Sequence, residues 1–117
     1  MKQILRITAK QLYDPFPDAR YLESPEFEDR LQQYQQGDFD FIGIRVEAEI
    51  LVNDVRQTIA SGGLWGIESD SDGAYFSEIE KEETRELGLI LTSLGFASTS
   101  IQERSSHITK AATWVDR

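Results

Sequence analysis

The chain has 117 residues, enough for one domain with a hydrophobic core and too few for two. It has no cysteine and no apolar run of membrane-spanning length, which excludes disulfides, cysteine-based metal sites and a membrane span. Its formal net charge is −9, and a field of that sign repels nucleic acid. We therefore expect a cytoplasmic protein, without a signal peptide, that binds neither membrane nor nucleic acid directly.

The negative charge is concentrated in two segments. Residues 14–40 carry eight acidic side chains against two arginines, and residues 68–86 carry eight against one lysine and one arginine. Such segments attract a basic protein surface. The alternative interpretation is that the acidic residues only keep a small domain in solution.

The N-terminal third predicts a strand, a loop and a helix. Residues 2–8 read as a short strand, and the prolines within residues 9–23 favour a structured loop. A helix is predicted over residues 25–36, with Ser24 as its cap and Gly37 as its stop.

The middle of the chain predicts a central strand and a meander. Residues 39–52 alternate between an apolar face and a face with charges in its middle, which is typical of a sheet with one buried side. Asn53 and Asp54 form a tight-turn dipeptide, after which residues 55–60 supply the partner strand of a hairpin. A short strand over residues 64–67 extends the sheet.

A long helix follows and ends near Leu94. Asp70, Ser71 and Asp72 are its candidate N-caps, and Gly95 is typical of a helix stop. The residues expected on its core-facing side are Phe76, Ile79, Glu83, Leu87, Ile90 and Leu94.

This order predicts an α+β fold, with an antiparallel sheet of three to four strands and two helices packed on one face. We expect residues 1–96 to form a single domain and residues 97–117 to form a weakly patterned tail that is partly docked. If residues 97–103 add a last strand, the alternative is a ferredoxin-like fold.

Three carboxylates of the long helix form the first candidate site. Glu78, Glu82 and Glu86 are spaced i, i+4, i+8, which places them in one row about 6 Å apart. Such a row approximates a line of backbone phosphates and would compete with nucleic acid for a basic groove. The alternative is a solvated helix face without a function.

Trp65 is the second candidate. Its segment, Gly62-Gly63-Leu64-Trp65-Gly66, lacks the spacing of a dinucleotide-binding loop and has no lysine to meet phosphate. Trp65 either packs on the sheet or serves as an exposed anchor for a partner protein.

Glu68, Asp70 and Asp72 are similar to the start of a calcium-binding loop. The pattern fails at its last position, where Ile79 stands in place of the bidentate glutamate. A turn with a helix cap is the preferred interpretation, and a weak metal site is the alternative. The single histidine, His107, has no nucleophile elbow near it, so we expect no catalytic residues and no cofactor.

One further observation is a resemblance. The segments GDFDFIGIRVEAE (residues 37–49) and QTIASGGLWGIESDS (residues 57–71) resemble a family of short, functionally uncharacterised proteins encoded by phages, plasmids and other mobile elements. The resemblance covers residues 11–96. It implies a bacterial host cell, where small acidic proteins of such elements can inhibit defence complexes, including CRISPR effectors. It carries over no catalytic residues.

We therefore expect a non-enzymatic acidic module that binds a basic surface of a nucleic-acid-handling complex through the glutamate row and Trp65. The alternative is a small metal-dependent module or enzyme centred on Glu68, Asp70 and Asp72.

Overall fold

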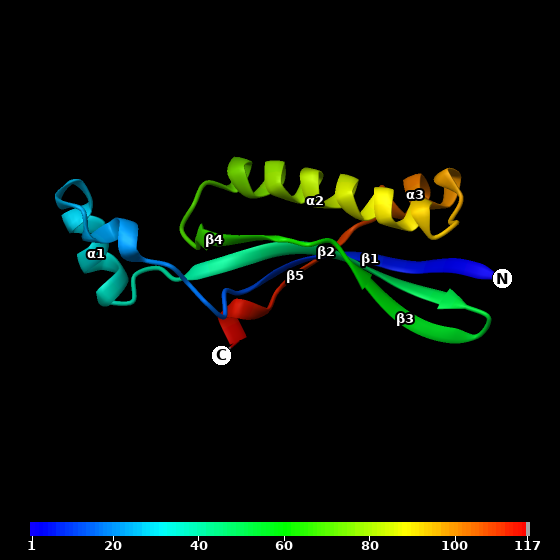
Figure 1. Ribbon diagram of the computed structural model, residues 1–117, viewed down its shortest axis with the longest axis horizontal. Coiled ribbons are helices and arrows are strands. Elements are labelled where there is room, and N and C mark those ends of the chain that lie inside the picture. Colours follow the sequence, from blue (N-terminus) through cyan, green and yellow to red (C-terminus); the bar gives the residue numbers. More distant parts are fainter. Residues whose placement is uncertain (117) are drawn as a thin grey trace.

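The computed structural model describes residues 1–116 and has an α+β fold, as predicted (Figure 1). Its strands are β1 (Lys2–Tyr13), β2 (Phe41–Val52), β3 (Val55–Ala60), β4 (Leu64–Glu68) and β5 (Thr109–Ala112). Its α-helices are α1 (Glu28–Gln35), α2 (Gly73–Ser93) and α3 (Ser98–Ser105), and its 3-10 turns are η1 (Arg20–Glu23), η2 (Pro25–Phe27) and η3 (Thr113–Asp116). Within residues 1–116, no helix is long and apolar enough to cross a membrane.

The strand β2 is the centre of the sheet. On one side it pairs antiparallel with β1 over almost its whole length, from Ile42 to Val52. On the other side its first residues pair with β4 and its last residues with β3. β5 joins the far edge of β1 in a parallel orientation. The prediction of an antiparallel sheet of three to four strands was therefore wrong, because within residues 1–116 the sheet has five strands and includes one parallel pair. A parallel pair needs a long connection, which α2 and α3 supply before β5.

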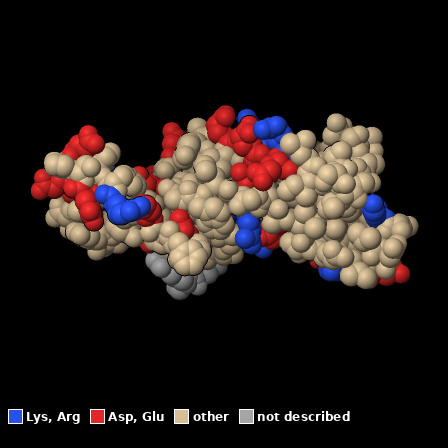
Figure 2. Space-filling model, viewed as in Figure 1, with Lys and Arg blue, Asp and Glu red and all other residues tan. Residues whose placement is uncertain are grey.

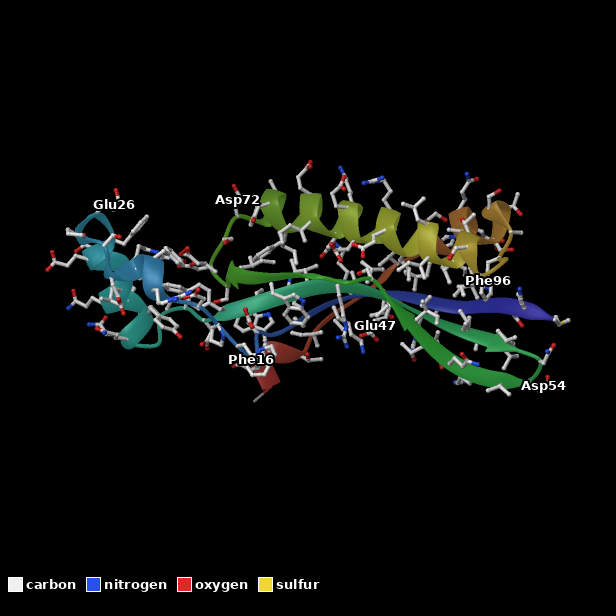
Figure 3. The ribbon with its side chains drawn as sticks, viewed as in Figure 1. Phe16, Glu26, Glu47, Asp54, Asp72 and Phe96 are labelled. Carbon is white, nitrogen blue, oxygen red and sulfur yellow. The ribbon has the colours of Figure 1, made fainter. Side chains whose placement is uncertain are left out.

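Alternation along β2 separates a covered face from an open one. Ile44, Val46 and Ala48 belong to the core that also contains residues of α2, whereas Glu47 lies on the side away from that helix (Figure 3). Both α2 and α3 lie over the covered face (Figure 1). α1 does not join them, so the predicted packing of residues 25–36 beside the long helix is not confirmed.

Most of residues 14–40, which we call the N-terminal lobe, lie beyond one end of the sheet (Figure 1). Aromatic contacts hold them there. The ring centroids of Tyr34 and Phe41 are 5.1 Å apart, and Phe39 and Leu22 are buried in the same cluster. The molecule is therefore elongated. Its radius of gyration is 16.9 Å, against about 13 Å for a compact chain of this length.

Two predicted boundaries in the N-terminal part were wrong. β1 continues to Tyr13, through residues expected in a loop, because those residues pair with the start of β2. The helix expected over residues 25–36 is divided into η2 and α1, and Ser24 makes no capping bond through its side chain. Gly37 does adopt the left-handed backbone expected of a helix stop, with φ of 82°.

The ferredoxin-like alternative required a strand over residues 97–103, and that strand does not form. Most of that range belongs to α3, in which Ile101 is buried against the core. The last strand comes later, as β5.

The variant Gly43→Ala tests the contact between β2 and Trp65. A Cβ at residue 43 would lie 2.0 Å from Trp65 Cε3, so the ring must leave the sheet. We expect the free energy of unfolding in urea to fall by about 1–3 kcal/mol and tryptophan fluorescence to shift to the red. Gly73→Ala is the control, because a Cβ there meets no atom within 4 Å. A Gly43→Ala protein with unchanged stability and emission would contradict the packing.

Candidate protein-binding surface

The helix α2 begins at one of the three candidate caps, Asp72. Asp72 accepts a hydrogen bond from the Ala74 amide at 2.9 Å, which satisfies one of the free N–H groups of the first turn. Acidic side chains gather over this helix and over the N-terminal lobe (Figure 2).

The buried side of α2 contains a carboxylate, Glu83, which is 8% exposed. Its Oε1 accepts hydrogen bonds from the Ser61 hydroxyl at 2.8 Å and from the Gly63 amide at 2.7 Å. The Ser61 hydroxyl also accepts from the Val46 amide at 3.0 Å. Glu83 therefore fixes the segment Ser61–Gly63, where β3 ends before β4 begins, to both α2 and β2.

The predicted row of glutamates lies beside this segment, but its members have different partners. Glu86 accepts from the Gly62 amide at 3.0 Å, so it has a structural role. Glu82 pairs with Arg85 at 3.2 Å, and both side chains are about two-thirds exposed. Glu78 has no hydrogen-bond or ion-pair partner among residues 1–116. Glu78 is thus open to a partner protein, and so is Glu82, because an ion pair this exposed contributes little and is easily exchanged.

A groove of about 260 Å³ lies between α2 and β4. It is lined by Leu64, Glu78, Ile79, Glu82 and Glu83. Leu64 is 42% exposed, which leaves an apolar floor next to the carboxylates of Glu78 and Glu82. This combination suits the aliphatic stem and charged end of a lysine or arginine side chain.

Trp65 lies on the opposite face of β4. Leu64 pairs with Ile44 on the face beneath α2, and successive strand residues point to opposite sides. The Trp65 ring covers Gly43, its Nε1–H donates to the Gly62 carbonyl at 3.2 Å, and it is 37% exposed. The structure therefore supports the packing interpretation of Trp65 and does not bring it onto the glutamate row.

Glu68 and Asp70 surround an arginine. The Arg30 guanidinium donates two hydrogen bonds of 2.9 Å to Asp70 and another to Glu68, and it lies 3.9 Å from the centre of the Phe39 ring. The hydrogen bonds from Arg30 lower the pKa of Asp70. The hydrogen bonds to Asp70 and Glu68 raise the pKa of Arg30. Asp72 caps α2 instead. Among residues 1–116, no three acidic or histidine side chains are placed to hold a metal ion.

Tyr21 completes this polar junction. Its hydroxyl donates to Glu68 at 2.9 Å. Partial burial, together with this hydrogen bond, raises the pKa of Tyr21 to about 12. Two of the three carboxylates considered as a metal site, Glu68 and Asp70, therefore join the N-terminal lobe to the end of β4 and the turn that follows it.

The open face of the sheet carries paired charges. Glu47 accepts from Lys10 at 2.9 Å and from Arg45 at 2.6 Å, and Glu49 lies between Arg6 and Arg56. Burial alone would raise the pKa of Glu47, but the bonds from the two cations outweigh it and lower that pKa. The basic groups of this face are thus engaged within the protein.

Comparison with known proteins identifies no relative: no family model, no curated protein and no solved structure matches the chain.

Sequence reasoning missed Arg30 and the part that Leu64 and Ile79 have in the groove. It did place Glu83 in an otherwise apolar helical stripe, and a carboxylate in such a position indicates a buried hydrogen-bond partner. Nothing local to Arg30 indicates its partners, which are 38 and 40 residues away.

The variant Glu83→Ala tests the anchoring of Ser61–Gly63. It leaves the Ser61 hydroxyl and the Gly63 amide without their acceptor, so we expect the free energy of unfolding to fall by about 1–3 kcal/mol. Glu83→Gln, which keeps an oxygen acceptor, should lose less. The exposed-site control is Glu82→Ala, expected to change stability by at most about 0.5 kcal/mol. Equal stability of Glu83→Ala and Glu82→Ala in urea unfolding would contradict the assignment.

The variant Asp70→Asn tests the Arg30 junction through pH. Because the folded-state pKa of Asp70 is lowered, its ion pair stabilises the protein above the unfolded-state pKa of about 3.9, and this contribution is lost as pH falls through the folded pKa. We expect Asp70→Asn to melt at a lower temperature than the original protein near neutral pH. This difference should narrow progressively below about pH 4.

The control for this experiment is Glu26→Gln, an exposed carboxylate of η2 with no partner among residues 1–116. It should melt like the original protein throughout. A melting-temperature difference for Asp70→Asn that stays constant through the acidic range would show that the Arg30 pair does not operate as described.

Proposed function

We propose that the protein is a non-enzymatic acidic module that binds a basic surface of another protein. The observation that carries this proposal is the groove between α2 and β4. There, the open carboxylates of Glu78 and Glu82 stand next to the exposed apolar side chain of Leu64. Carboxylates at the rim of an apolar patch suit lysine and arginine side chains, whose stems pack while their charges pair.

The proposed partner is a protein that handles nucleic acid. Its basic binding site would accept the carboxylates of Glu78 and Glu82 in place of phosphates, so that the module competes with nucleic acid for that site. The resemblance to proteins of phages and other mobile elements supports a setting in a bacterial host cell, with a host defence complex such as a CRISPR effector as the partner. The proposed protein would bind such a complex in the cytoplasm of the host cell.

Charge reversal tests this function. The tagged double variant Glu78→Lys/Glu82→Lys should recover its host-lysate partner at less than a tenth of the original level, because like charges now face the basic surface. The control, Glu26→Lys/Asp38→Lys, makes the same change in net charge in the N-terminal lobe and should recover the partner much as before. Recovery by the original protein should fall as salt rises.

Two results would contradict the proposed function. One is undiminished recovery by the Glu78→Lys/Glu82→Lys protein. The other is an equal loss in both double variants, which would assign the effect to net charge rather than to this surface.

A further inference from the structure

The strand β4 has one free edge. It pairs with β2 on one side, and within residues 1–116 no strand pairs with its other side. A strand edge of this kind presents unpaired N–H and C=O groups that can accept another extended segment. The groove described above is lined by Leu64, at the start of this strand, and by residues of α2.

The two faces of β4 carry the exposed side chains of the candidate site. Leu64, with Glu78 and Glu82 beside it, lies on the face beneath α2, and Trp65 lies on the other face. A partner that approaches α2 from outside can meet the carboxylates but not Trp65. A segment lying along the edge meets both, because its alternate side chains point to the two faces.

We propose that an extended basic segment of the partner adds as a strand to the free edge of β4. This inference rests on the proposed function and specifies how the partner binds. The side chains of the added segment that face α2 are arginine or lysine. Their aliphatic stems pack over Leu64, and their charged ends pair with Glu78 and Glu82. Side chains on the other side are apolar and pack against Trp65.

The neighbouring segment sets the limits of this strand. Glu83 and Glu86 already bind the amides of Gly63 and Gly62, respectively, so the open edge begins at Leu64. Within β4, the Gly66 amide donates to Asp14 Oδ2 at 2.9 Å and the Glu68 carbonyl accepts from the Ser71 amide at 3.0 Å, so these two groups do not bind the added strand. β4 has five residues, and its pairing with β2 contains one extra residue between Leu64 and Ile67. Because such a bulge disrupts regular pairing, only a few backbone bonds form with the added strand. The contacts with Leu64, Trp65 and the carboxylates therefore supply much of the affinity and the choice of sequence.

The test uses an acetylated, amidated peptide of alternating arginine and valine, about eight residues long, and the same peptide N-methylated at its central amides. Methylation removes the N–H donors and keeps the charge, so it blocks strand addition but leaves charge attraction. With the full ¹⁵N-labelled chain, we expect saturable amide shifts at β4 and at residues 78–83 of α2. Methylation should weaken binding at least tenfold.

Variants identify the two faces. Leu64→Ala and Trp65→Ala should each weaken binding of the unmethylated peptide several-fold. Leu89→Ala, which truncates a leucine of α2 that is 61% exposed and lies outside the groove lining, should not. One result would overturn strand addition and leave the acidic surface as the binding site. In it, the two peptides bind the original protein equally well, and neither binds the Glu78→Lys/Glu82→Lys protein. Absence of saturable binding, or shifts that spare β4, would overturn strand addition as well.

Discussion

The hydrogen bonds of Glu83 to Ser61 and Gly63 are the contacts on which the arrangement of this surface depends. β2 is long enough to pair with two successive strands on the same side, and the chain must leave β3 and re-enter the sheet as β4. A buried carboxylate costs free energy unless its oxygens are hydrogen-bonded. Here the polar groups of the crossing segment satisfy the carboxylate, and the carboxylate in turn fixes that segment beneath α2.

This constraint divides the acidic residues of α2 into two kinds. Glu83 and Glu86 hold the backbone between β3 and β4. Glu78 and Glu82, about two turns and one turn before Glu86, face a groove that the same anchoring leaves open. The Arg30 junction makes a similar use of acidic residues at the other end of β4. Acidic residues in this chain are therefore of two kinds, structural and available, and a count of net charge does not distinguish them.

Local sequence signals predicted the elements that depend on local geometry. The alternation of β2, the turn after it, the Asp72 cap and the left-handed Gly37 are properties of short segments, and the structure has all of them. Features decided by distant partners were not predictable in this way. The extension of β1 depends on pairing with β2, and the parallel placement of β5 depends on the path of the chain after α2.

The candidate site divides along the same line. Helical spacing was sufficient to place the glutamates in one row. Which of them would be hydrogen-bonded within the protein depended on where residues 61–63 lie. Trp65 could be assigned to a face only once the pairing of β4 with β2 was known.

Amide hydrogen exchange of the full chain, followed residue by residue, tests the central claim most directly. The account predicts slow exchange at Gly62 and Gly63, and fast exchange at the amides of β4 that point away from β2, apart from that of Gly66, which donates to Asp14. It also predicts loss of protection at Gly63 in Glu83→Ala. Fast exchange at both glycines, or slow exchange along the outer edge of β4, would contradict the division of α2 into anchoring and open carboxylates.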